Sequence, residues 1–366
     1  MKTLFKNSIA IFAIAVVLFS CSKNDDTQAT SEQVFPPYEY TANVYVAGGT
    51  NGKATIWKNG IASDLPDGTS ATDVYVSGND VYACGQKQVI LTGKGRYWKN
   101  GVATMLSSDY NSVFVNSIFV SDGVIYCCGS VQNVSEGSKA CFWKNGVATI
   151  LSNSAGNSAD DTATGIYVAG NTVYICGTVR EGAFDPIAKV WKIVGANNPT
   201  VTALSTNAKD TFAAGITVVG SDVYVVGHEQ NSNASSRKPV VFKNSTKSYL
   251  PFSANAVEGN AKDITTSGTD IFVSGYDLSN LASSNSYFWK NGVATNLTSA
   301  TTDFNSRDHS WAPTGITVFN GSVYQSADDG YLGNFNAMFL VGSRPVYLTN
   351  SETIKSFANA IFVTPL

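Results

Sequence analysis

The chain has 366 residues, of which 43% are hydrophobic, 11% aromatic and only 14% charged, and its formal net charge is −3. This composition excludes an intrinsically disordered chain, because the apolar and aromatic content is sufficient for a packed core. The acidic balance also argues against binding to nucleic acid and against electrostatic docking on anionic lipid, since both need a basic surface.

Residues 1–20 have the features of an export signal. Lys2 and Lys6 provide a positive end, and the apolar run from Ile9 to Phe19 is too short to span a bilayer. The sequence LFSC at residues 18–21 follows, and it resembles the lipobox of bacterial lipoproteins. The resemblance implies cleavage before Cys21, acylation of this cysteine and attachment to a lipid membrane through the acyl chains. An ordinary signal peptide with a chance cysteine is the alternative.

The residues after Cys21 indicate a destination. Ser22 is not the Asp of inner-membrane retention signals, so the resemblance favours an outer-membrane lipoprotein. The stretch SKNDD at 22–26 is similar to the short charged tag of surface-exposed lipoproteins of Bacteroidota type, which favours the cell surface over the periplasmic face. Residues 21–40 are mostly polar and are expected to form a flexible tether. Without the export signal the chain keeps 22 basic and 27 acidic residues, a net charge of −5.

One unit recurs from about residue 41 to the C-terminus. Each copy has a short apolar strand, a tight turn, a second strand of type V-Y-x-x-G, a variable connection and a third strand that ends in W-K-N-G or a variant. The first-strand Ile or Val recurs every 44 to 52 residues, at Val74, Ile118, Ile166, Ile216, Ile264, Ile316 and Ile361. The third-strand aromatic recurs at Trp57, Trp98, Trp143, Trp191, Phe242, Trp289 and Phe339. Such a period indicates an array of similar supersecondary units.

Each full unit contains four predicted strands, such as GIYVA, TVYICG, AKVWK and VTAL between residues 163 and 205. Enrichment in Val, Ile, Tyr and Thr between Gly and Asn favours strands over helices. The Asn-Gly pairs that follow several third strands are typical of two-residue hairpins, in which both turn residues have positive φ. The WKNG motif is therefore interpreted as a turn signal rather than as a docking site.

Four-stranded antiparallel units of this length resemble the blades of a β-propeller. The first unit, from about Asn43, has only three predicted strands, and the chain ends in a lone strand at Ala360–Val363. Three strands and one strand complete a seventh blade. We therefore expect an all-β, seven-bladed β-propeller over residues 41–366, whose closing blade is shared by the N- and C-terminal strands. An open solenoid is the alternative, and it would need capping repeats that the sequence lacks.

The cysteines of the repeat are expected in the core. Cys84, Cys128 and Cys176 occupy one repeat position, which favours small buried side chains and free thiols. Cys127 and Cys141 lie on the second and third strands of one blade. If Gly129 pairs with Lys139, Cys127 faces Cys141, and the oxidising environment of an exported protein would permit a cross-strand disulfide. Two free thiols are the alternative.

The strand order of a blade predicts where function lies. Both variable connections of each blade leave at one end, which we name face X, and both short turns leave at the other end, face Y. Recognition tends to use variable loops on a rigid scaffold, so face X is the predicted binding face. Its candidate ligand-contacting residues are Asp73, Arg180, His228, Glu229, Asp263, Tyr276, Asp277, Arg307, Asp308, His309, Trp311 and Asp328. For each of them, an ordinary solvated loop residue is the alternative.

Known catalytic motifs are absent from the sequence, which contains no G-x-S-x-G, no H-E-x-x-H and no phosphate-binding G-x-x-x-x-G-K-[ST]. The two histidines, His228 and His309, lie in different kinds of loop, and the acidic pairs are too short for a calcium loop. We therefore expect no cofactor, no bound metal and no catalytic residue. Convergence of Asp73 and Asp263 across the central channel would be the exception, as a carboxylate pair.

Three functions follow from these features. The first is a membrane-anchored, non-catalytic propeller that binds a glycan, peptide or partner protein through face X. The second is a polysaccharide-active enzyme that uses carboxylates at the propeller mouth, for which two or three carboxylates within about 5–10 Å would be the sign. The third is a structural subunit of an envelope complex. The fold alone does not choose among them.

Overall fold

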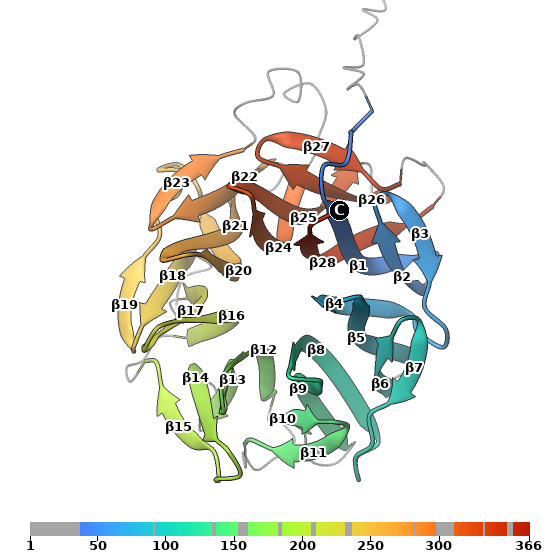
Figure 1. Ribbon diagram of the computed structural model, residues 1–366. Helices are drawn as coiled ribbons and strands as arrows, with labels where there is room; N and C mark the ends of the chain where they lie inside the picture. Colours follow the sequence, from blue (N-terminus) through green and yellow to red (C-terminus); the bar gives the residue numbers. More distant parts are fainter. Residues whose placement is uncertain are drawn as a thin grey trace, which may run out of the picture. The chain divides into compact units, whose positions relative to one another are not determined.

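The computed structural model describes residues 37–90, 92–133, 137–152, 160–181, 185–205, 210–230, 236–280, 283–297, 311–331, 334–349 and 354–366. All described strands belong to the compact unit Tyr38–Leu366. Across these residues, 28 strands form seven four-stranded antiparallel sheets arranged as a ring, without helices (Figure 1). The chain is therefore a seven-bladed β-propeller, as the repeat predicts. In the part of the chain that the structure describes, no helix is long and apolar enough to cross a membrane.

Each blade runs from an inner strand at the channel to an outer strand at the rim. Blade 1 consists of β28 (Ser356–Thr364), β1 (Asn43–Thr50), β2 (Lys53–Lys58) and β3 (Ile61–Asp64). Blades 2 and 3 contain β4 (Ser70–Ser77), β5 (Asp80–Val89), β6 (Thr92–Lys99), β7 (Val102–Met105), β8 (Ser112–Ser121), β9 (Val124–Asn133), β10 (Gly137–Lys144) and β11 (Val147–Ile150).

The remaining blades repeat this order. Blades 4 and 5 contain β12 (Thr162–Ala169), β13 (Thr172–Glu181), β14 (Asp185–Val194), β15 (Thr200–Ala203), β16 (Asp210–Val219), β17 (Asp222–Gln230), β18 (Arg237–Lys243) and β19 (Thr246–Tyr249). Blades 6 and 7 contain β20 (Glu258–Ser267), β21 (Asp270–Asn280), β22 (Ser283–Lys290), β23 (Val293–Asn296), β24 (Trp311–Phe319), β25 (Ser322–Tyr331), β26 (Asn334–Val341) and β27 (Arg344–Tyr347).

Closure of the ring uses both ends of the repeat. The C-terminal strand β28 pairs antiparallel with β1, from Asn43 opposite Thr364 to Thr50 opposite Ser356. The pairing gives β1 a neighbour on each side and leaves no open sheet edge at the seam. The predicted mixed blade is confirmed.

The tight turns of face Y have the predicted backbone geometry. Both residues of each Asn-Gly turn have positive φ, for example 49° at Asn100 and 80° at Gly101. The Asn100 side chain also holds the turn, because its Oδ1 accepts the Val81 N–H at 2.8 Å and its Nδ2 donates to Asp80 at 2.7 Å. The same Asn–Asp hydrogen bond recurs with Asn244 and Asn291. The WKNG motif is thus a hairpin signal in this structure.

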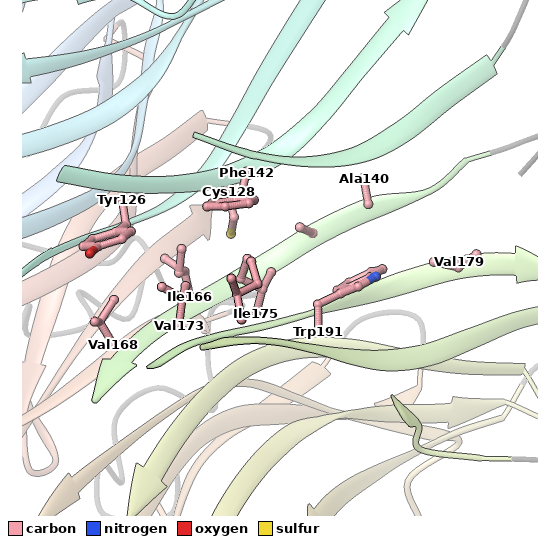
Figure 2. Packing of buried hydrophobic residues seen from close by; sticks show 12 residues of the cluster. Tyr126, Cys128, Ala140, Phe142, Ile166, Val168, Val173, Ile175, Val179 and Trp191 are labelled. Atoms are coloured by element: carbon pink, nitrogen blue, oxygen red, sulfur yellow. The ribbon is translucent and has the colours of Figure 1, made fainter. Parts of the chain in front are cut away.

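The core consists of apolar clusters between adjacent blades. Figure 2 shows one of them, where Cys128 and Phe142 of blade 3 face Ile166, Ile175 and Trp191 of blade 4. The tryptophan at this repeat position is at most 1% exposed in blades 1 to 4 and in blade 6, so each one anchors its blade.

One assignment within the repeat needs correction. In six blades the third-strand aromatic lies opposite the fourth residue of the second strand, as Trp98 lies opposite Ala83. The equivalent of Ala83 in blade 7 is Gln325, and it pairs with Leu340 rather than with Phe339. Phe339 is still fully buried, because side chains on both faces of β26 are packed in the core, as the burial of its neighbours Met338 and Leu340 shows.

Every inner strand begins four to six residues before the Ile or Val that marks it in the repeat, and every inner strand contains a β-bulge. A bulge inserts one residue into the ladder and breaks the alternation of faces on which strand prediction depends. Asp73, Asp263 and their equivalents therefore lie within inner strands rather than just before them. The bulge residues are Thr72, Asn116, Thr164, Ala214, Lys262, Thr314 and Asn359.

Five of the seven bulge residues connect neighbouring blades. Each donates a side-chain hydrogen bond to a carbonyl of the next inner strand: Thr72 to Val115 at 2.7 Å, Asn116 to Ala163 at 2.8 Å, Thr164 to Ala213 at 3.0 Å, Thr314 to Ala358 at 2.7 Å and Asn359 to Ala71 at 2.7 Å. Ala214 has no donor, and Lys262 makes no such bond within the described residues. The circle of bonds is therefore interrupted at the two junctions that flank β20.

The predicted register of β9 and β10 is wrong by two residues. Gly129 lies opposite Cys141, not Lys139, and Cys127 lies opposite Trp143. The whole ladder sets this register, with Asn133 opposite Gly137 at one end and Tyr126 opposite Lys144 at the other. Cys127 and Cys141 are consequently not cross-strand neighbours, and both are free, buried thiols, as are Cys84, Cys128 and Cys176.

Candidate functional site

Face X gathers some of the predicted residues, while others lie outside the described residues. Because adjacent strands are antiparallel, the second-to-third and blade-to-blade connections of each blade share one end of the sheet. Cys21, Arg307, Asp308 and His309 lie outside the described residues. Trp311 begins β24, and only its place in the ladder, opposite Asp329, is described.

Asp73 joins blade 2 to blade 3. Its Oδ1 accepts the Val74 N–H at 2.8 Å, and its Oδ2 accepts the Ile118 N–H at 2.9 Å and the Ser117 hydroxyl at 2.8 Å. Burial raises the pKa of Asp73 to about 6, although these hydrogen bonds stabilise the ionised form. Both carboxylate oxygens are thus engaged by the inner strands.

Asp263 has the same role between blades 6 and 7. Its Oδ1 accepts the Ile264 N–H at 2.8 Å, and its Oδ2 accepts the Ile316 N–H at 3.1 Å. Burial raises the pKa of Asp263 to about 7, and the negative charge of Asp73 adds to the rise. The two predicted carboxylates therefore influence each other electrostatically, while each is held at its own blade junction.

The other predicted acids of blades 5 to 7 are also engaged by the protein. Asp328 accepts the Ala358 N–H at 2.6 Å, and burial raises its pKa to about 7. Glu229 is buried and binds the Lys247 ammonium and, at 2.5 Å, the Tyr249 hydroxyl. Asp277 is fully buried and accepts the Ser253 N–H at 3.0 Å and the Asn285 amide at 2.7 Å.

Glu229 and Asp277 belong to a repeat position that the sequence analysis did not recognise. The equivalent residue of blade 7 is Asp329, which is buried and accepts the Tyr347 hydroxyl at 2.9 Å. Three consecutive blades thus place an acid here, and each acid accepts hydrogen bonds from the protein itself. These acids stabilise the blades. Arg180, on β13 of blade 4, pairs with Asp160 at 3.2 Å.

His228 and Tyr276 are the predicted residues that the structure brings into one group with unused polar atoms. This group, named the blade 5/6 cluster, consists of Phe212, His228, Arg237, Glu258, Lys262 and Tyr276. Phe212 lies opposite His228 in the ladder, and their rings stack with centroids 4.6 Å apart. Arg237 Nε lies 3.9 Å from Glu258 Oε2, which is an ion pair without a hydrogen bond.

The electrostatics of the blade 5/6 cluster are dominated by positive charge. Burial, with a smaller contribution from the charges of Arg237 and Lys262, lowers the pKa of His228 to about 4, so the ring is neutral at pH 7. Although Lys262 is an exposed residue, desolvation by the surrounding protein and the charge of Arg237 lower the pKa of its ammonium. Burial raises the pKa of Tyr276, with a further rise from Glu258. Two cations and one carboxylate thus share this part of face X.

Four members of the blade 5/6 cluster are not among the site residues predicted from the sequence. Phe212 and Glu258 lie in the extended starts of inner strands that the bulges conceal, and Arg237 begins β18 opposite Gln230. Lys262 did carry a signal, because the other bulge positions hold Thr, Asn or Ala and this one holds a long cationic side chain. A polar exception within a structural repeat marks a functional candidate.

The blade 5/6 cluster contains polar and aromatic groups that a ligand can contact. Among the described residues, no group of three or more His, Cys, Asp or Glu side chains is placed to hold a metal ion. The cluster offers an exposed ammonium, a guanidinium whose Nε has no hydrogen-bond partner, a phenol and a stacked aromatic pair. These groups can pair with an anion and pack on a flat ring.

Comparison with known proteins supports the fold. No protein-family model and no curated protein matches the chain. The chain is similar to the beta-propeller domain of the Trilobed protease from Pyrococcus furiosus, with 8% identity and a TM-score of 0.50 over 86% of this chain and 96% of that one. It is also similar to the acylaminoacyl peptidase of Pyrococcus horikoshii, with 11% identity and a TM-score of 0.50 over 86% of this chain and 51% of the peptidase.

At these identities the similarity concerns the fold alone. The chain spans about half the length of the Pyrococcus horikoshii peptidase, which has 51% of its length covered. The Pyrococcus furiosus domain is described as having an open velcro topology, whereas β28 pairs with β1 here.

Proposed function

We propose that this chain is a membrane-anchored, non-catalytic binding propeller that recognises a glycan, peptide or protein through face X at blades 5 and 6. The supporting observation is a contrast between two sets of polar side chains. The buried acids bind backbone amides and side chains of the protein itself, whereas His228 and Lys262 make no hydrogen bond or ion pair within the described residues. Side chains without protein partners are available to a ligand.

A catalytic carboxylate pair has less support. A general acid and base must exchange a proton with the substrate during the reaction. Asp73 and Asp263 instead use both oxygens to accept backbone N–H groups, and Asp328 accepts another. The arrangement fits residues that join blades, so the binding function is preferred over the polysaccharide-active enzyme.

The anchor belongs to the same proposal. The lipobox-like sequence at 18–21 would place an acylated Cys21 at the start of a polar tether in the outer membrane, with the propeller at the cell surface. Metabolic labelling with a fatty-acid analogue should label the native chain and not Cys21→Ala. Labelling that persists in Cys21→Ala would contradict acylation at this residue.

Binding can be tested with the full chain in detergent on a glycan and peptide array. We expect a ligand whose binding falls at least tenfold in His228→Ala and in Tyr276→Ala. Val102→Ser is the matched control, because Val102 is 70% exposed next to a face Y turn. Loss of binding in Val102→Ser alone, or accumulation of cleaved ligand, would refute a non-catalytic site on face X.

A further inference from the structure

We infer that the blade 5/6 cluster binds a sugar ring that carries a carboxylate, with Lys262 and Arg237 pairing with the carboxylate and the aromatic side chains packing on the ring. The inference rests on the proposed function and assigns a ligand class to the same site.

The first argument is charge. The chain is acidic overall, yet two cations, Arg237 and Lys262, influence each other here, and the ion pair with Glu258 involves Arg237. The Arg237–Glu258 separation of 3.9 Å is an ion pair without hydrogen-bond geometry, and Arg237 Nε is buried with no hydrogen-bond partner. A buried donor without a hydrogen-bond partner lowers the stability of the protein, and an anionic ligand would supply the missing acceptor.

The neighbouring acids do not neutralise Lys262. Asp263 follows it in the chain, but its two oxygens accept the Ile264 and Ile316 N–H groups. Asp277 is turned to Ser253 and Asn285, and Glu229 to Lys247 and Tyr249. Asp263, Asp277 and Glu229 therefore already have protein partners.

The second argument is the position of Lys262. In five other blades, the side chain of the equivalent Thr or Asn donates a hydrogen bond to the next blade. Lys262 is exposed and makes no such bond within the described residues. Lys262 lacks the structural hydrogen bond of its repeat position and instead carries an exposed charge on the inner strand. Binding of a ligand explains the presence of a lysine at this position.

The third argument concerns the body of the ligand. The Phe212–His228 stack of blade 5 and Tyr276 of blade 6 present half-buried aromatic surface. Asn260 lies directly opposite Tyr276 in the ladder, so the two side chains are on one face of the sheet. Asn260 is only 3% exposed, and its Nδ2 has no hydrogen-bond partner. Aromatic surface beside a free amide donor suits a ring with hydroxyl groups better than an extended apolar peptide.

The test compares methyl glucuronoside with methyl glucoside, which differ by the carboxylate. Calorimetry on the full chain in detergent at pH 7 should give at least tenfold tighter binding of the glucuronoside, weakening as salt is raised. Lys262→Thr restores the residue type of blades 2, 4 and 7, so it should fold normally and lose this discrimination. Ala214→Thr adds a similar hydroxyl at the neighbouring bulge without changing charge and should bind as the native chain does.

Each outcome separates the two proposals. Equal affinity for both glycosides, with loss in Tyr276→Ala, would overturn the carboxylate assignment and leave binding through face X intact. Unchanged discrimination in Lys262→Thr would also overturn the assignment. No binding of the glucuronoside, together with binding of an acidic peptide, would replace the sugar by a peptide. Binding lost in Val102→Ser but kept in Lys262→Thr and Tyr276→Ala would overturn both proposals.

Discussion

The carboxyl groups of Asp73 and Asp263 on inner strands and of Asp328 on β25 predict an unusual dependence of stability on pH. Asp263 and Asp328 have a pKa of about 7, and Asp73 has a pKa of about 6, against an ordinary value of 3.8. Between pH 6 and pH 8 the unfolded chain has already lost these protons, whereas the folded chain still holds part of them. The folded state therefore binds more protons in this window, and its stability falls as the pH rises.

The size of the effect follows from linkage. A carboxyl group whose pKa moves from about 4 to about 7 on folding lowers the free energy of unfolding by about 1.4 kcal/mol between pH 6 and pH 8. Two such groups and the smaller contribution of Asp73 give about 3 kcal/mol, and His228, whose pKa is lowered to about 4, opposes this by about 1 kcal/mol. Solvent at the channel wall screens these groups, so we expect a net fall of about 1–2 kcal/mol.

Urea unfolding followed by tryptophan fluorescence measures this difference directly, since the tryptophans are buried in blade interfaces. The double variant Asp263→Asn, Asp328→Asn cannot titrate at these positions and should lose most of the fall. Asp80→Asn is the control, because pairing with Lys99 holds the pKa of Asp80 below its usual value, outside the window. Equal or higher stability of the native chain at pH 8, or an undiminished fall in the double variant, would refute the reasoning.

Three further predictions concern the frame of the propeller. Gly129→Ala would place a Cβ 2.0 Å from the Phe114 carbonyl oxygen, so we expect a loss of about 3 kcal/mol, seen as a lower Tm, whereas Ala327→Gly in the equivalent position of blade 7 should change little. Deletion of residues 356–366 removes β28 and should abolish cooperative thermal unfolding, with recovery on addition of the corresponding peptide. Five thiols, at Cys84, Cys127, Cys128, Cys141 and Cys176, should be unreactive in the native chain and titrate after unfolding; only three would titrate if Cys127 and Cys141 were joined.

The architecture was readable from the sequence because its signals are local and repeated. An Asn-Gly pair specifies a hairpin without knowledge of the rest of the chain, and seven copies of one unit specify the ring. The incomplete first unit and the lone terminal strand then fixed the closure. The register of β9 and β10 was not readable in this way, since a pairing offset of two residues keeps every side chain on its original face. Sequence alternation cannot separate Lys139 from Cys141 as the partner of Gly129.

The site was harder to predict because the bulges hide the upper part of each inner strand. Repeat alignment brought out His228 and Tyr276, but it gave equal weight to Asp73, Asp263 and Asp328, whose carboxylates join the blades. Whether a polar residue serves the frame or a ligand depends on its hydrogen-bond partners, and those come from the neighbouring blade, some 30 to 45 residues away in the chain.

Lys262 shows how the two classes can be separated. Around the ring, the bulge position is a structural one, and Thr or Asn at five of its seven places joins one blade to the next. Loss of that bond at Lys262 weakens the junction between blades 6 and 7, where the Asp263 carboxylate still bridges to Ile316. If Lys262→Thr raises the Tm while it removes binding, the native lysine lowers stability in favour of recognition. A lower Tm in Lys262→Thr would instead assign Lys262 to the frame.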